Sequence, residues 1–200
     1  RAATVIQALG HLPLDVRTTP VDIVACGAQK WLLSPWGSGF LYVRRELIPT
    51  LQSPFAGWTA FEGSDDFSTL LKYGEPLRAD ARRFELITLP FQDFLGMNLA
   101  LDLLDELGVD RIAAHVARIG EPVREWARQR DIRLLNPEGS RDSGMLCLRA
   151  ADLPGGLDAL RAAGVATCIR EGALRLSPHC YNTIEEMVRV TELLEQARSR

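Results

Sequence analysis

The chain is poor in lysine. Only Lys30 and Lys72 occur among its 23 basic residues, so arginine carries nearly all of the positive charge. Arginine keeps its proton in proteins, whereas a lysine in apolar surroundings can favour its neutral, nucleophilic form. Such an amine can form a Schiff base with a carbonyl compound. Because Lys30 lies inside the largely apolar segment 21–43, it is the first candidate for chemistry.

An excess of charge of one sign is also absent. The formal net charge is −3, and many arginines neighbour acids, as in Arg44-Arg45-Glu46. Proteins that bind nucleic acid typically carry a basic stripe with interleaved aromatic residues, and this sequence has none. No run approaches 18 apolar residues, the length needed to span a bilayer. We therefore expect neither nucleic acid nor membrane as a partner.

Closely spaced cysteines are absent as well. The four cysteines form no CxxC pair, which disfavours a metal site and favours a reduced intracellular protein. They are Cys26, Cys147, Cys168 and Cys180. The first residues resemble no signal peptide, so we expect a cytoplasmic protein. The chain starts in structured sequence without an initiator methionine, which suggests truncation.

Short apolar runs bounded by glycine or proline predict strands in the first half of the chain. Residues 21–26 and 39–43 have this pattern, and 4–9 reads as a strand or its exit. A short helix is expected at 46–51. The segment 52–83 is aromatic and polar without clear periodicity, which is typical of a functional or mobile loop.

The second half alternates helices with short strands. Leucine-rich sequence from Pro90 to Gly108 predicts a helix, and Asp110 is expected to cap the next one. The further expected elements are strands at 132–135, 144–149, 166–170 and 173–177, and helices at 158–163 and after Thr183. We place a domain boundary near Pro90, giving domains 1–90 and 91–200.

Two local signals in this half are specific. Glu171-Gly172 lies between two strand-like runs and predicts a tight hairpin. Thr183 and Glu186 have the spacing of a capping box, which marks the start of a helix.

Four motifs, at 7–15, 27–43, 82–88 and 169–183, together resemble the class V aminotransferases. These are pyridoxal-phosphate enzymes of fold type I, and they include cysteine desulfurases, kynureninases and isopenicillin-epimerase-like proteins. The resemblance covers essentially all of the chain, while family members are considerably longer at the N-terminus. It implies an α/β fold: the C-terminal part of a fold type I large domain, followed by a small α+β domain.

The resemblance also assigns residues to the cofactor, pyridoxal 5'-phosphate. Lys30 matches the lysine that forms the Schiff base and then moves the α-proton. Gln7 matches a side chain that contacts the phenolic oxygen, and Gln29 a residue near the phosphate. Thr88 matches a threonine that reaches the phosphate of the neighbouring subunit's cofactor, which implies a homodimer with a shared active site.

Residue type alone supports other roles for these positions. Without its motif, Lys30 reads about equally well as a lysine that snorkels at a strand end. A glutamine at a strand exit, such as Gln7, is more often a turn residue. The hydroxyl of Thr88 could cap the helix after Pro90, and this role is compatible with phosphate binding.

Two arginines in the last motif are candidates for binding the substrate. Arg175 matches the arginine that holds the α-carboxylate of an amino acid, since a planar guanidinium can bind a carboxylate through two hydrogen bonds. Arg170 is the weaker candidate. Alternation with Leu174 and Leu176 places Arg175 on the face opposite the core, which suits a surface arginine equally well.

The sequence departs from the family pattern at three points. Thr4 stands where relatives carry an aspartate beside the pyridine nitrogen, and threonine supplies no negative charge. The residue that stacks on the ring and the main phosphate-binding loop are expected upstream of residue 1. Only residues 171–174 separate Arg170 from Arg175, too few for the loop that carries the catalytic cysteine of desulfurases.

These observations predict a pyridoxal-phosphate-dependent aminotransferase that acts on an amino acid through Lys30. Epimerisation and lyase chemistry begin from the same covalent adduct and stay open as alternatives. The second hypothesis is a truncated or degenerate homologue that keeps the fold and dimer surface without catalysis. The aromatic residues Phe55, Trp58 and Phe61 are candidates for lining the side-chain pocket.

Overall fold

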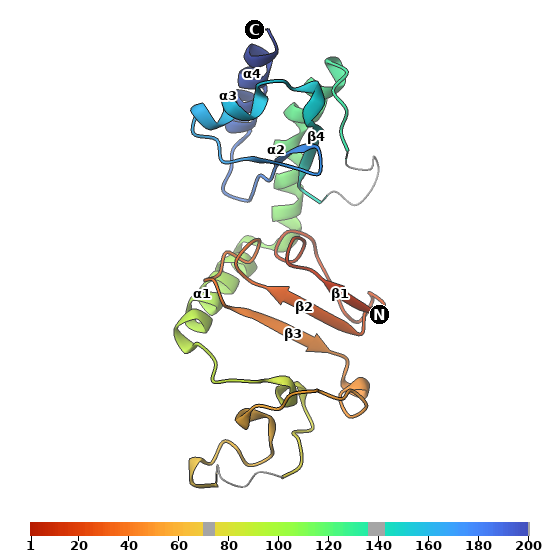
Figure 1. The fold of residues 1–200 in the computed structure, drawn as a ribbon, viewed down its shortest axis with the longest axis vertical. Coiled ribbons are helices and arrows are strands. Elements are labelled where there is room, and N and C mark those ends of the chain that lie inside the picture. The colour runs from red at the N-terminus through yellow and green to blue at the C-terminus, as the bar shows by residue number, and fades with distance from the viewer. Residues whose placement is uncertain (70–74, 136–142, 200) are drawn as a thin grey trace. The chain divides into compact units, whose positions relative to one another are not determined.

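A computed structural model describes residues 1–69, 75–135 and 143–199 (Figure 1). Lys72 lies outside the described residues. The chain forms two compact units: Arg1–Gly10 with Leu14–Glu106, and His11–Pro13 with Leu107–Arg200. The units therefore divide after Glu106, whereas the sequence-based domain boundary lies at 90/91 and stays a proposal.

The first unit contains a three-stranded sheet in the order β1-β2-β3 (Figure 1). The strands are β1 (Ala2–Thr4), β2 (Ile23–Gly27) and β3 (Gly39–Val43). β1 runs parallel to β2, and β2 runs antiparallel to β3. The strands expected at 21–26 and 39–43 are thus confirmed.

The segment 4–9 is the exit of a strand. β1 ends at Thr4, and the carbonyl of Val5 accepts hydrogen bonds from the N–H groups of Ala8 and Leu9. These bonds close a turn and prevent the strand from continuing, although the residues themselves are apolar.

The segment 45–84 consists of loops and short 3₁₀ helices in its described part. A 3₁₀ helix at Arg45–Leu47 replaces the helix expected at 46–51. The aromatic segment is held together by backbone bonds, which include Gly57 N–H to the Glu85 carbonyl at 3.3 Å and Arg78 N–H to the Ala60 carbonyl at 2.9 Å. It is therefore an ordered loop within its described residues.

The helix expected after Pro90 is confirmed as α1 (Phe91–Leu107). It passes close to the loop after β2, since a Cβ placed on Gly96 would lie 2.8 Å from Cγ of Pro35. Gly108, with φ 81°, ends this helix. Along one stripe of the helix the apolar side chains are exposed: Phe91, Leu95, Leu99, Leu103 and Leu107.

The second unit contains four elements that follow the pattern expected from the sequence. These are α2 (Val109–Gln129), α3 (Gly156–Ala162), β5 (Cys168–Arg170) and α4 (Ile184–Arg198). The expectation that Asp110 caps α2 is wrong, because the helix already begins at Val109 and Gly108 occupies the cap position.

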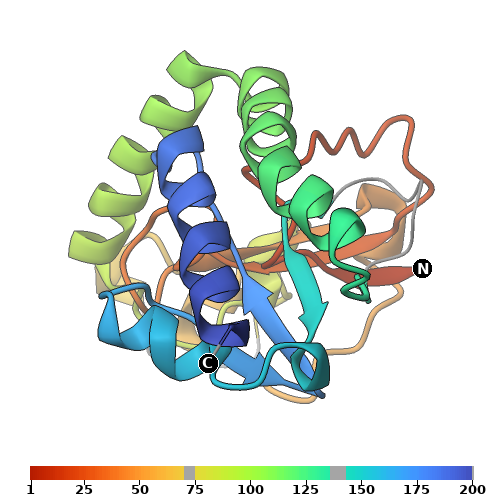
Figure 2. The ribbon, with the colours of Figure 1, turned by 90° about the horizontal axis from the view of Figure 1, so that it is seen from above.

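The antiparallel sheet of this unit has the order β4-β6-β5, with β4 (Leu146–Arg149) and β6 (Ala173–Leu176). α2 and α4 lie side by side, and α3 packs against α4 (Figure 2). The strand expected at 132–135 is wrong, since Leu134 forms only an isolated bridge with Leu148. The core of the unit includes Ile119, Val123, Leu146, Leu148, Leu174, Leu176, Val190 and Leu194.

Candidate functional site

Gln7 and Lys30 follow neighbouring parallel strands at the same edge of the first sheet. Thr4, the last residue of β1, pairs with Ala25 of β2, so the carboxyl ends of the two strands lie side by side. Gln7 is the third residue after β1, and Lys30 is the third after β2. In open α/β sheets, ligands bind outside this edge. The structure thus brings two of the predicted cofactor residues to an edge where ligands typically bind.

The backbone around Lys30 is anchored on both sides. Ala28 N–H donates to the Ser38 carbonyl at 3.0 Å, and Ser34 N–H donates to the Ala28 carbonyl at 3.1 Å. Leu33 N–H donates to the carbonyl of Lys30 itself at 3.0 Å. The neighbouring side chains of Ala28, Trp31 and Leu32 are buried. A lysine set in such a turn has a well-defined position for its Cα atom.

Gly10 connects the segment of Gln7 to the turn of Lys30. It has φ 95°, and a Cβ placed on it would lie 2.6 Å from the carbonyl oxygen of Trp31. The chain after Gln7 therefore passes directly against the backbone of the residue after Lys30. This contact requires a residue without a side chain.

The side chain of Lys30 is exposed. The expectation that its amine lies among apolar neighbours is therefore wrong for this chain. The turn after β2 directs Ala28, Trp31 and Leu32 into the core, which leaves Lys30 to point away from it. The amine is accessible to a small molecule from solvent.

Gln29 lies over Gly27. A Cβ placed on Gly27 would be 2.6 Å from Oε1 of Gln29 and 3.0 Å from Cδ1 of Ile6. A serine at this position would require the Gln29 side chain to move. The absence of a side chain at position 27 thus makes room for a half-buried amide at the same sheet edge as Lys30.

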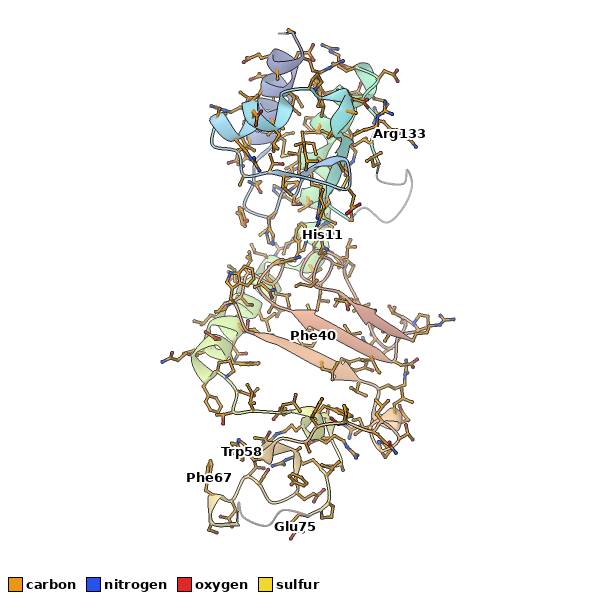
Figure 3. All side chains as sticks on the ribbon, in the orientation of Figure 1. His11, Phe40, Trp58, Phe67, Glu75 and Arg133 are labelled. Carbon is orange, nitrogen blue, oxygen red and sulfur yellow. The ribbon has the colours of Figure 1, made fainter. Side chains whose placement is uncertain are left out.

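Thr88 lies on an exposed segment of the first unit. Its Oγ1 accepts a hydrogen bond from Nε1 of Trp58 at 3.3 Å. The Trp58 ring in turn lies 5.8 Å from the ring of Phe67, centre to centre (Figure 3). Sequence reasoning made Trp58 a candidate for lining the side-chain pocket but did not place it beside Thr88, because no local pattern predicts a bond to a residue 30 positions away.

Arg175 lies in the middle strand of the second sheet. Leu174 and Leu176 are buried while Arg175 is partly exposed, which confirms the alternation seen in the sequence. Its Nη2 lies 2.9 Å from Sδ of Met145. The hydroxyl of Thr167 donates to the backbone carbonyl of Arg175 at 2.5 Å. Arg175 belongs to the second unit, whereas Lys30 belongs to the first.

The hairpin between β5 and β6 is as tight as the sequence predicts. Glu171 has φ 49° and Gly172 has φ 73°, so both turn residues are left-handed. A two-residue turn of this kind matches the twist of the flanking strands. Arg170, which precedes the turn, is exposed.

All four cysteines are free thiols, and they differ in environment. Burial raises the pKa of Cys26 and of Cys180, which keeps these thiols protonated and weakly nucleophilic. Cys168 is exposed on β5, where its backbone position pairs with that of Arg175. Within the described residues, no group of three or more His, Cys, Asp or Glu side chains could hold a metal ion.

The profile of the family described as Aminotransferase class-V matches residues 4–190. This chain belongs to the class V aminotransferase family. The family uses pyridoxal phosphate as its cofactor. Across the part of the chain that the structure describes, no helix has the length and apolar content needed to span a bilayer.

Two curated relatives are similar over most of the chain. An uncharacterized aminotransferase of Bacillus subtilis (strain 168), YcbU, is 34% identical over 181 residues, which are 90% of this chain and 47% of that protein. An isopenicillin N epimerase of Streptomyces clavuligerus is 30% identical over 204 residues, covering 94% of this chain and 50% of that protein. The chain therefore spans about half the length of these relatives.

Solved structures of fold type I confirm the fold. A cysteine desulfurase from Escherichia coli, CsdA, superposes with a TM-score of 0.81 at 17% identity, covering 98% of this chain and 51% of that one. The expected architecture is thereby confirmed: the C-terminal part of a fold type I large domain, followed by a small α+β domain.

Proposed function

We propose that this chain forms part of a pyridoxal-phosphate-dependent enzyme that transfers the amino group of an amino acid, with Lys30 as its covalent anchor for the cofactor. The observation that carries the proposal is the placement of Lys30. Its amine is exposed on an anchored turn, at the carboxyl edge of parallel strands, beside the exit that holds Gln7.

The residues present suit this cofactor. Lys30 offers a reachable primary amine for the aldehyde carbon, and Gln7 offers an amide for the phenolic oxygen. Gln29 is the proposed partner of the phosphate in the same site, and the hydroxyl of Thr88 is the proposed partner of the phosphate of the neighbouring subunit's cofactor. Bound pyridoxal phosphate supplies an electron sink for charge at the α-carbon of an amino acid. The amine of Lys30 would accept and return the α-proton.

Thr4 limits how strongly such a site could draw electrons. It ends β1 with an exposed side chain, and its hydroxyl carries no charge to balance a protonated ring nitrogen. This position supports the second hypothesis, a degenerate homologue that keeps the fold and a dimer surface without catalysis. The anchored turn that carries Lys30 supports the hypothesis of a catalytic protein.

Substrate binding is the proposed role of Arg175, with Arg170 as the weaker candidate. Arg175 stands on the face of the sheet opposite the buried Leu174 and Leu176, where its guanidinium can meet a carboxylate. A small amino acid as substrate, a cytoplasmic location and a homodimer with a shared active site belong to the same proposal.

Two related reactions are the alternatives within the family. Epimerisation is supported by the 30% identity to isopenicillin N epimerase. Desulfurase chemistry, a lyase-type reaction at sulfur, is opposed by the tight β5–β6 hairpin, because its turn of Glu171 and Gly172 leaves no loop for a catalytic cysteine.

The deciding experiment is reduction of the protein with borohydride in the presence of pyridoxal phosphate, followed by peptide mass spectrometry. We expect a visible absorption band before reduction and a covalent pyridoxyl group on the peptide of Lys30. Lys30→Ala should lose both signals. Lys72→Ala is the matched control, because it removes the only other lysine of the chain. Equal labelling of wild type and Lys30→Ala would sink the proposal.

An amino-acid screen separates the reactions. Transfer of the amino group to an added keto acid produces a new amino acid, whereas epimerisation produces only the opposite enantiomer of the substrate. With an active substrate in hand, Arg175→Gln should raise KM more than it lowers kcat, since the guanidinium is proposed to bind the carboxylate. An unchanged KM would remove Arg175 from the site.

A further inference from the structure

We infer that Trp58 is a positioning residue that fixes the hydroxyl of Thr88 as a hydrogen-bond donor toward phosphate. The inference rests on the proposed function, which pairs Thr88 with the phosphate of the cofactor. It adds a residue that carries no charge and lies 30 positions away in the sequence.

The chemistry of the pair decides the direction of the hydroxyl. The indole N–H of Trp58 can only donate, and it lies 3.3 Å from Oγ1 of Thr88. A threonine hydroxyl has one donor and two acceptor lone pairs. Once a lone pair of Oγ1 accepts from the indole, the O–H of Thr88 is directed away from the ring. Phosphate oxygens are acceptors, so the O–H that the indole leaves free can donate to one of them.

The backbone holds the two residues at this spacing. Gly57, just before Trp58, donates its N–H to the Glu85 carbonyl at 3.3 Å. A Cβ placed on Gly57 would overlap the carbonyl of Leu86, so the two backbone segments are in direct contact. The register between the segment of Trp58 and the segment of Thr88 is therefore set by backbone contact, without reliance on flexible side chains.

The Trp58 ring also has an aromatic neighbour. It lies 5.8 Å from the ring of Phe67 at an interplanar angle of 42°, an arrangement typical of packed aromatic pairs (Figure 3). Thr88, by contrast, is exposed and reachable from solvent. The indole donor thus meets a hydroxyl that a ligand can reach from solvent.

The test separates the indole N–H from the bulk of the ring. Trp58→Phe keeps an aromatic ring beside Phe67 and removes the donor, and Thr88→Val removes the hydroxyl at nearly constant volume. The dissociation constants of pyridoxal phosphate and of pyridoxal, which lacks the phosphate, are measured on the full chain. We expect Trp58→Phe to raise the dissociation constant of pyridoxal phosphate about tenfold and to leave that of pyridoxal unchanged. Circular dichroism verifies that each variant is folded.

The double variant tests whether Trp58 acts through Thr88. If it does, adding Trp58→Phe to Thr88→Val has no further effect on the affinity for pyridoxal phosphate. Thr88→Ser, which keeps a hydroxyl, should retain an affinity close to wild type. An independent additive loss in the double variant would overturn the inference.

A second readout needs no cofactor. The indole N–H resonance of Trp58, identified among the four tryptophans by its loss in Trp58→Phe, should shift when inorganic phosphate is added. Thr88→Val should abolish that shift, and chloride at equal ionic strength should cause none. If phosphate did not change the chemical shift of the Trp58 indole N–H, the inference would be overturned.

The outcomes distinguish this inference from the proposed function. If wild type forms the Lys30 adduct while Trp58→Phe binds pyridoxal phosphate as tightly as wild type, the positioning role fails and the proposed function stands. A wild-type protein that forms no adduct removes both. If Trp58→Phe lowered the affinity for pyridoxal phosphate and for pyridoxal equally, Trp58 would have a general structural role, and the inference would also be overturned.

Discussion

At the scale of single residues, glycine permits the close backbone contact that surrounds the candidate site. Gly10 combines a left-handed φ of 95° with direct contact to the backbone of Trp31. Gly39 faces Gly27 across β2 and β3, and a Cβ there would lie 2.5 Å from the carbonyl oxygen of Cys26. The position of the Lys30 turn thus depends on residues that have no functional group.

Gly10→Ala should lower the free energy of unfolding by roughly 2–4 kcal/mol, since left-handed strain of about 1 kcal/mol adds to overpacking of about 1–3 kcal/mol. Gly164→Ala is the matched control, because Gly164 also has a positive φ of 79° but no atom of the described residues lies within 4 Å of the added Cβ. Urea unfolding of both variants gives the comparison. If Gly10→Ala lowered the free energy of unfolding no more than Gly164→Ala, the result would contradict the contact between Gly10 and Trp31.

Asp15 provides a test of local electrostatics. The side chain of Arg17 hydrogen-bonds its carboxylate and lowers the pKa to about 2 from the ordinary 3.8. Because the folded pKa is the lower one, the stabilisation is present above the unfolded pKa and is lost as pH falls toward about 2. Carbon-detected NMR titration should show this value. In Arg17→Ala the pKa of Asp15 should rise toward 3.8 but stay below it, because the backbone N–H of residue 17 still donates to the carboxylate at 2.8 Å. An unchanged midpoint would exclude the Arg17 side chain as the main cause.

At the scale of elements, α4 shows how a local signal and a packed face combine. The hydroxyl of Thr183 accepts from Glu186 N–H at 3.2 Å, and the Glu186 carboxylate accepts from Thr183 N–H at 2.9 Å. Hydrogen bonds from the side chain of Asn182, which has the larger effect, and from the backbone N–H of Thr183 lower the pKa of Glu186. The capping contribution is therefore present above the unfolded pKa of Glu186 and is lost as pH falls through the lowered folded value.

Thr183→Ala should cost about 1 kcal/mol of unfolding free energy, the usual loss when an N-cap hydroxyl is removed. Thr183→Ser keeps the hydroxyl and should stay close to wild type. Thermal and urea unfolding at neutral pH measure both. Identical stability of the alanine and serine variants would show that the capping box is energetically silent.

At the scale of the whole molecule, the chain divides into two units, each with its own sheet. Sequence pattern assigned the helix after Pro90 to the second domain because it begins a helix-rich stretch. The structure groups most of α1 with the first unit, where Gly96 lies against Pro35. Side-chain pattern describes which face of a helix is apolar, but it does not identify the partner that this face contacts.

A core substitution tests whether the units are energetically separate. Leu194 is fully buried in α4, so Leu194→Ala should cost about 2–5 kcal/mol in the second unit. Hydrogen exchange should increase in β4, β6 and α4 while β1, β2 and β3 keep wild-type protection. Val188→Ala, at an exposed position of the same helix, is the control. Faster exchange throughout both sheets would show a single cooperative unit.

Sequence pattern alone predicts the features that depend on neighbouring residues: the strands near 21–26 and 39–43, the Glu171-Gly172 turn and the capping box of Thr183. It also carried the family, because the match to the class V aminotransferases over residues 4–190 includes all four motifs. These signals are local, since backbone conformation and capping are decided within a few positions.

The exposure of Lys30 and the bond between Trp58 and Thr88 follow from packing in three dimensions. Lys30 is surrounded by apolar residues in the sequence, yet the turn after β2 buries those neighbours and leaves its amine outside. Exposure and long-range hydrogen bonds depend on how segments far apart in the sequence pack together, and no local pattern contains that information.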